Sequence, residues 1–144
     1  MLLGPGEFIQ IRKKVQRELV RLGYNVIIME DIREEITDVG LDEKFERIMK
    51  GFAPLFIAFF HKEAKNMEGV IFEIGCICCK YGCRKIGKRL RLLADKKYDW
   101  DKRTPYINTL FSRVVKDEFD ESKSHHKASK RIHNFVVDFL GIKD

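Results

Sequence analysis

The stretch 66-NMEGVIFEIGCICCKYG-82 decides how the middle of this chain is expected to fold. Its pattern predicts a helix, and the runs before and after it, PLFIAFF and RLRLLA, are apolar and too short for free-standing helices. Strands that are apolar on both faces and alternate with helices indicate a parallel sheet covered by helices on both sides. Within the expected helix one carboxylate, Glu73, lies between Phe72 and Ile74, and a charged residue in so apolar a stretch requires an explanation.

The rest of the chain continues the alternation of helices and strands. We expect, in chain order, a helix over residues 7–22, a strand in YNVIIME, a helix around Leu41 to Met49, the strand PLFIAFF, the helix quoted above, the strand RLRLLA, a last strand in FSRVVKDEF and a closing helix from about Glu121. We therefore expect an α/β fold with a five-stranded parallel sheet in the order 2-1-3-4-5. Only MLL precedes the first glycine, so the first strand is very short or the chain begins a few residues late.

Composition limits the classes of protein that need to be considered. The 144 residues, of which 44% are hydrophobic, suit a single domain spanning residues 1–144. No run is long enough to span a membrane, and MLLGPGEFIQIRKK lacks the basic leader and apolar middle of a signal peptide, so we expect a cytoplasmic protein. Charged residues make up 35% of the chain, a composition that leans toward a thermophile.

The net charge of +6 raises the question of an anionic partner. Many of the basic side chains fall in residues 80–97, here called the basic stretch: Lys80, Arg84, Lys85, Lys88, Arg89, Arg91, Lys96 and Lys97. One interpretation is a solvated helix end followed by an edge strand whose charges discourage sheet-to-sheet pairing. The other is a surface that binds nucleic acid.

Two segments fall where open α/β sheets bind ligands, beyond the carboxyl ends of the strands. GPGEF, residues 4–8, follows the first strand and opens the first helix, so its backbone amides are suited to bind an anion such as a phosphate. A Gly-Pro-Gly turn is, however, also a common connection between a strand and a helix. GVIFEIG, residues 69–75, follows the third strand, and we expect Glu73 in the first helical turn beside the same crevice. A carboxylate there is stabilised by the helix end whether or not it has a catalytic role.

The combination of LLGPGEF, an apolar strand after the first helix, and GVIFEIGCI resembles the nucleoside 2-deoxyribosyltransferase superfamily, including its relatives that hydrolyse deoxynucleoside 5'-monophosphates. Proteins of that family have an opening strand that ends in a Gly-Pro turn and a Gly-x-x-x-Glu-[Leu/Ile]-Gly signature followed by small residues. The residues that match are Gly69, Glu73, Ile74 and Gly75, with Cys76 and Cys78 at the small positions. The resemblance covers the order of elements along most of the chain and implies a flavodoxin-like, three-layer fold.

The resemblance implies that Glu73 is the catalytic nucleophile, which attacks the anomeric carbon and forms a glycosyl-enzyme intermediate. An ionised carboxylate suits this role because the oxocarbenium-like transition state needs a nearby anion. The substrate-binding residues that it implies are Gly4, Pro5, Gly6, Phe8, Gly69 and Gly75. Glycines at 69 and 75 would let backbone and sugar approach closely.

The chain departs from the family pattern at three places. Ala53 and Pro54 stand where the family usually has an acidic residue, and the segment 66–68 stands where it has a further Asp. Ile71 replaces what is often a small residue. Glu68 is a candidate for the acid in place of the missing groups.

Four cysteines crowd residues 76–83, too close together for a disulfide framework, and a cytosol would keep them reduced. Cys76, Cys79 and Cys83 recur at i, i+3 and i+7, which predicts that this helix face packs on the sheet. One helix cannot surround zinc with four thiolates, and imidazoles on a charged helix, in SHHKASKRIH, are usually solvated: His125, His126 and His133. We expect neither a metal nor a cofactor.

The expected function is the binding of a nucleoside or nucleotide, with cleavage or transfer at its N-glycosidic bond through Glu73. The alternative from another class is a non-catalytic nucleotide sensor or a nucleic-acid-associated module that uses the basic stretch. An activity like that of NAD glycohydrolases is a third interpretation, because related proteins with a similar sheet cleave NAD. The base, the sugar, the acceptor and the participation of a homodimer stay open.

Overall fold

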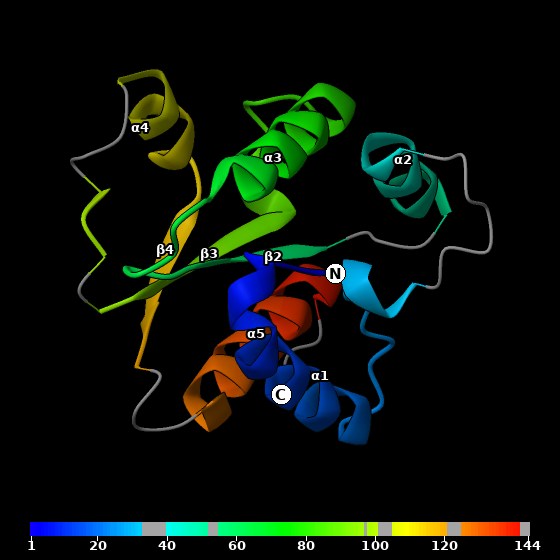
Figure 1. Ribbon diagram of the computed structural model, residues 1–144. Helices are drawn as coiled ribbons and strands as arrows, with labels where there is room; N and C mark the ends of the chain where they lie inside the picture. Colours follow the sequence, from blue (N-terminus) through cyan, green and yellow to red (C-terminus); the bar gives the residue numbers. More distant parts are fainter. Residues whose placement is uncertain (33–39, 52–54, 97, 101–104, 121–124, 142–144) are drawn as a thin grey trace.

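The computed structural model describes residues 1–32, 40–51, 55–96, 98–100, 105–120 and 125–141. These residues form a four-stranded parallel sheet with helices on both faces (Figure 1). The strands, hydrogen-bonded in the order β1-β2-β3-β4, are β1 (Leu2–Leu3), β2 (Phe56–Phe60), β3 (Leu90–Asp95) and β4 (Val115–Phe119). The α-helices are α1 (Ile9–Arg21), α2 (Leu41–Gly51), α3 (Glu68–Tyr81), α4 (Pro105–Phe111) and α5 (His125–Leu140). Three short 3-10 helices are η1 (Gly6–Phe8), η2 (Met29–Asp31) and η3 (Ile86–Lys88).

The strand β2 forms the centre of the core because all five of its residues are buried. Successive side chains of a strand point to opposite faces of the sheet. Phe56, Ala58 and Phe60 accordingly pack in the cluster with α2, α3 and α4, whereas Ile57 and Phe59 pack in the cluster with α1 and α5. Figure 1 shows the same division, with α2, α3 and α4 on one side of the sheet and α1 and α5 on the other.

The prediction of five strands is wrong for the described residues, and the order 2-1-3-4-5 is not confirmed. YNVIIME gives a single isolated parallel bridge between Ile28 and Leu2, and η2 follows at once. The strand β1 is only two residues long, so it offers few partners. The Leu2 N–H donates to the Ile27 carbonyl at 2.9 Å, and this bond fixes the segment beside the sheet without a ladder.

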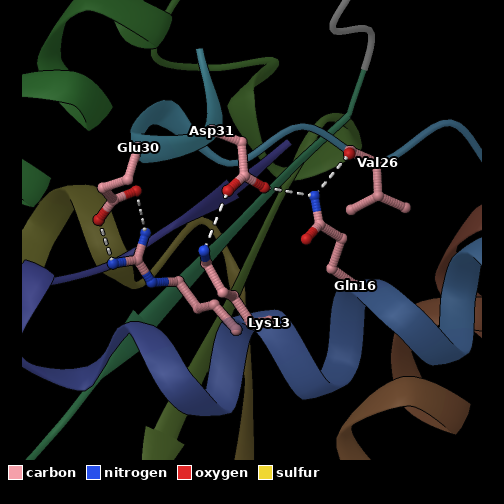
Figure 2. Close-up of polar contacts among 6 residues, drawn as sticks. Lys13, Gln16, Val26, Glu30 and Asp31 are labelled. Atoms are coloured by element: carbon pink, nitrogen blue, oxygen red, sulfur yellow. Dashed lines mark hydrogen bonds and ion pairs between the residues drawn. The ribbon is translucent and has the colours of Figure 1, made fainter. Parts of the chain in front are cut away.

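Side chains from α1 hold the segment that replaces the expected strand (Figure 2). The Gln16 side-chain amide donates to the Val26 carbonyl at 3.1 Å and to an Asp31 carboxylate oxygen at 2.8 Å. Lys13 pairs with Asp31 at 3.3 Å. The Val26 carbonyl is a backbone group that a strand ladder would otherwise have satisfied, and the two contacts with the Asp31 carboxylate fix η2 over α1.

Several predicted boundaries shift in the structure. RLRLLA forms β3, which lies between β2 and β4 and is therefore not the edge strand of the first interpretation. FSRVVKDEF gives only β4, because the helix α4, which the sequence pattern missed, ends at Phe111. The closing helix α5 begins at His125, and the expected start near Glu121 lies outside the described residues.

Within the described part of the chain, no helix combines the length and the apolarity needed to cross a membrane.

At Gly87 two backbone segments approach so closely that no side chain fits between them. Gly87, in η3, lies against the chain that leads into β4, and a Cβ added there would sit 2.3 Å from the Arg113 carbonyl oxygen. The close approach brings η3 directly under the start of β4. A larger residue at 87 would have to push these backbones apart.

Candidate functional site

The helix α3 positions Glu73, but not in its first turn. The Asn66 side-chain oxygen accepts the Glu68 N–H at 2.7 Å, and α3 begins at Glu68, so Glu73 is the sixth helical residue. The expectation of a first-turn glutamate is therefore wrong. The effect of the helix end decays within the first turn, so it does not account for a carboxylate at this position.

Glu73 lines a pocket of about 650 Å³ between η2, α2 and α3, here called the Glu73 pocket. Its lining residues are Met29, Glu30, Phe45, Glu68, Gly69, Phe72 and Glu73. Of the residues singled out in the sequence, the pocket brings together Glu73, Gly69 and Glu68. Phe72 is 55% exposed and leaves an aromatic ring at the surface beside them.

The Glu73 carboxyl is partly buried, and burial raises its pKa from 4.5 to about 7. The Arg12 guanidinium opposes this rise, whereas the Glu30 carboxylate adds to it. Within the described part of the chain, no hydrogen bond or ion pair engages the Glu73 carboxylate. Glu73 thus combines a raised pKa with lone pairs that are available to a ligand.

The Arg12–Glu30 ion pair lies next to Glu73 and was missed in the sequence. Arg12 Nη1 donates to Glu30 Oε2 at 3.1 Å, and Nη2 donates to Glu30 Oε1 at 2.6 Å, so the pair is bidentate. The Arg12 side chain is 1% exposed and that of Glu30 is 34% exposed. Figure 2 shows the Glu30 carboxylate held from α1 beside the contacts of Asp31.

One signal in the sequence could have found Arg12. It falls four residues after Phe8 and three before Val15, on the same face of α1 as buried Val15 and Leu19. A charged residue on the core face of a helix needs a partner, because an unpaired buried charge is costly. The partner, Glu30, is 18 residues away in the chain and has no periodic relation to Arg12.

The GPGEF turn borders the ion pair and does not line the Glu73 pocket. Arg12 Nη2 donates to the Pro5 carbonyl at 3.0 Å. A Cβ added at Gly4 would lie 3.0 Å from Arg12 Nε, and one added at Gly6 would lie 4.0 Å from Glu30 Oε1. Gly4 therefore leaves room for the Arg12 side chain, whereas a Cβ at Gly6 would make only an ordinary contact, and Arg12 connects the turn to the pocket.

Phe8 and Glu7 contact the loop that follows β2. The Phe8 ring stacks on His61 with 4.1 Å between ring centroids and 10° between planes. Glu7 Oε1 accepts the Lys65 backbone N–H at 2.7 Å. Burial lowers the pKa of His61 to about 4, so its imidazole is neutral at physiological pH. The expected substrate-binding residue Phe8 packs on the scaffold in this structure.

Gly75 lies away from the Glu73 pocket, in a second pocket of about 310 Å³ that all four cysteines help to line. The predicted thiol face is wrong, because Cys78 is buried, Cys79 is exposed, and Cys76 and Cys83 are only partly buried. The residues of α3 that face the sheet are Val70, Ile74, Ile77 and Cys78. Burial, and to a smaller extent a hydrogen bond with Cys83, raise the pKa of the Cys78 thiol to about 12.

No three Cys, His, Asp or Glu side chains among the described residues are grouped so that they could hold a metal ion. The histidines of α5 contact α1 and the segment after it. His133 Nδ1 and the Tyr24 hydroxyl lie 2.7 Å apart, and His125 Nε2 lies 3.1 Å from Glu18 Oε1. Ala53 and Pro54, which replace the acidic residue of the family, lie outside the described residues.

Part of the basic stretch is used in packing. The Arg89 guanidinium lies 4.7 Å from the Tyr81 ring centroid and 5.4 Å from that of Phe139, and Arg91 lies 4.3 Å from the Phe135 ring. Arg84, Lys85 and Lys88 are exposed, and Lys97 lies outside the described residues. The free surface for an anionic partner is therefore smaller than the sequence indicates.

Comparisons with protein-family models, with curated proteins and with solved structures return no match for this chain.

Proposed function

We propose that the chain binds a nucleoside or nucleotide in the Glu73 pocket and cleaves or transfers its N-glycosidic bond, with Glu73 as the nucleophile. The observation that carries the proposal is the Glu73 carboxylate itself: partly buried, with a pKa raised to about 7 and no hydrogen bond from the described residues, in a pocket of about 650 Å³. Perturbed carboxyls in clefts are the usual mark of acid, base and nucleophile roles.

The chemistry requires Glu73 to be ionised. Its carboxylate oxygen attacks the anomeric carbon, the bond from that carbon to the base breaks, and the electron pair leaves with the base, which takes up a proton. Water, or a second base in a transfer reaction, then attacks the same carbon and releases Glu73. We assign the proton donor to Glu68, because it lines the pocket and does not belong to the Arg12–Glu30 pair.

The fold assignment belongs to the same proposal. We propose a flavodoxin-like domain in which the bridge between Ile28 and Leu2 takes the position of the second strand, so that the order follows 2-1-3-4-5. The Glu73 pocket would then lie near the point where the chain passes from one face of the sheet to the other, where such folds bind ligands.

The test is a panel of nucleosides, deoxynucleoside 5'-monophosphates and NAD, with release of the free base as the readout. Wild-type protein should release base from at least one compound, with a rate that rises with pH through about 7 as Glu73 ionises. Glu73→Gln keeps the shape and removes the anion, so it should abolish turnover and leave binding largely intact. Glu63→Gln, at an exposed glutamate after β2, is the matched control and should keep the wild-type rate.

Two results would redirect the proposal. Binding of a panel compound without turnover would favour the nucleotide sensor. Salt-dependent binding of oligonucleotides with no small-molecule ligand would favour a nucleic-acid-associated module based on exposed Arg84, Lys85 and Lys88.

A further inference from the structure

The charged side chains that line the Glu73 pocket are all acidic. Three carboxylates line it, from Glu30, Glu68 and Glu73, together with the rings of Phe45 and Phe72. No Lys or Arg belongs to the described residues that line it. Carboxylates beside aromatic rings favour flat cations, because both the anion and the face of the ring attract positive charge.

The cation nearest to Glu73 is already engaged. Arg12 donates twice to Glu30 and once to the Pro5 carbonyl, and because its side chain is only 1% exposed, another anion has little access to the N–H groups that remain. A phosphate that sought Arg12 would have to displace Glu30 from a bidentate pair. The GPGEF turn, where the sequence suggested a phosphate site, also presents the exposed Glu7 carboxylate.

We infer that the Glu73 pocket selects N-glycosides whose base carries a positive charge and whose sugar carries no phosphate. The inference rests on the proposed function, because it takes the ligand to be an N-glycoside bound beside Glu73. A cationic base is held by Glu73 and Glu68 and stacks on Phe72, whereas a phosphate inside the same pocket meets carboxylates and no Lys or Arg among the described lining residues. The selection thus follows from charge, not from the size of the pocket.

A cationic base also couples binding to the ionisation of Glu73. The free carboxyl has a pKa of about 7, under the influence of Arg12 and Glu30, so it is partly protonated near neutral pH. A bound cation favours the carboxylate and lowers this pKa, so binding should release protons. The same positive charge makes the base a better leaving group, because the base departs neutral and needs no proton from Glu68.

The test compares the binding of three related compounds that differ in the charge of the base or in the presence of a 5'-phosphate. Nicotinamide riboside carries a permanent pyridinium charge, its dihydro form is neutral and nearly isosteric, and nicotinamide mononucleotide adds the 5'-phosphate. By isothermal titration calorimetry, the cationic riboside should bind about tenfold tighter than either of the other two. Titrations in buffers of different ionisation enthalpy should show proton release near pH 7 for the cationic riboside and none for its neutral dihydro form.

Glu73→Gln should reduce the preference for the cation and abolish the proton release, whereas Glu63→Gln should keep both. Equal affinities for the charged and neutral ribosides, tighter binding of the mononucleotide, or no binding of any of the three would overturn the inference. Its failure is distinguishable from failure of the proposed function. Base release from the wider panel without a charge preference would leave the function standing, and charge-selective binding without base release from any compound would remove only the catalysis.

Discussion

Replacing Glu73 by Gln should make the protein more stable above neutral pH, and the size of the effect follows from the structure. The folded state holds the Glu73 proton up to a pKa of about 7, whereas the ordinary value for an unfolded chain is 4.5. Between these values the folded state binds more protons than the unfolded state, so the free energy of unfolding falls as pH rises. The contribution of Glu73 is fully present below pH 4.5 and is lost as pH passes through about 7.

The size of this change in the free energy of unfolding follows from the difference between the folded and unfolded pKa values of Glu73. One pKa unit corresponds to about 1.4 kcal/mol, so a rise from 4.5 to about 7 gives roughly 3 kcal/mol, which solvent screening of a partly buried group reduces to about 2 kcal/mol. Burial is the main cause of the raised pKa; the Arg12 guanidinium lowers it and the Glu30 carboxylate raises it further. Because Gln resembles the protonated carboxyl in shape, the variant should match the wild type near pH 4.5 and exceed it by about 2 kcal/mol near pH 8.

The assay is urea denaturation of wild type and variant at a series of pH values, and the informative quantity is the difference between the two proteins. His61 makes the difference necessary, because its lowered pKa of about 4 removes stability as pH falls from 6.5 and so masks the Glu73 effect in wild type alone. Glu63→Gln should show a flat difference from wild type. A difference for Glu73→Gln that stays flat or falls between pH 4.5 and about 8 would refute the reasoning about its burial.

Two further predictions concern stability. Glu30→Gln leaves the Arg12 guanidinium buried with a weaker partner, and we expect it to lower the free energy of unfolding by about 2 kcal/mol, below the 3–5 kcal/mol of a fully buried pair because Glu30 is 34% exposed. Gly87→Ala forces a Cβ toward the Arg113 carbonyl oxygen, and we expect a loss of about 1–3 kcal/mol, measured by the same denaturation.

Matched substitutions separate these effects from general sensitivity. Glu43→Gln removes an exposed partner of Arg47 on α2 and should cost less than about 0.5 kcal/mol, so an equal loss for Glu30→Gln and Glu43→Gln would contradict a special role for the Arg12 pair. Gly75→Ala adds a Cβ that meets nothing within 4 Å in a helix, and it should be neutral or stabilising. A harmless Gly87→Ala would mean that the backbones around η3 move apart easily.

The sequence predicted the elements whose pattern is local. The five buried residues of β2 follow from a hydrophobic run alone, and the existence of α3 follows from its pattern, although the side of α3 that faces the sheet was predicted wrongly. The strand expected in YNVIIME failed for a reason that is not local: β1 is too short to extend a ladder, and Gln16 and Lys13 of α1 take up polar groups of the segment instead. The helix α4 was missed because its sequence, PYINTLF, is too short to show a helical period.

For the candidate site, the signature indicated Glu73 and Gly69, and Glu68 was added as a candidate acid; these three residues line one pocket and lie within six residues of one another on α3. It did not find Glu30 or Arg12, because their contact depends on how η2 folds back over α1. The expectation that Glu73 lies in the first turn of α3 was also wrong, since the helix begins at Glu68, and even a start at Gly69 would have put Glu73 beyond the first turn. Contacts between segments distant in the chain carry the electrostatics of this site, and no period in the sequence encodes them.

The Arg12–Glu30 pair is difficult to explain by stability alone. A buried ion pair can often be replaced by apolar residues of similar volume with no loss of stability, and position 12 shares a helix face with Val15 and Leu19, where a leucine would suit the core. What an apolar pair could not supply is the field at Glu73, where Arg12 holds the pKa below the value that burial and Glu30 alone would give. That field keeps Glu73 ionisable near neutral pH although the carboxylates of Glu30 and Glu68 line the same pocket, which is the condition that the proposed carboxylate nucleophile requires. The buried arginine is therefore better explained by the chemistry of the pocket than by the packing of the core.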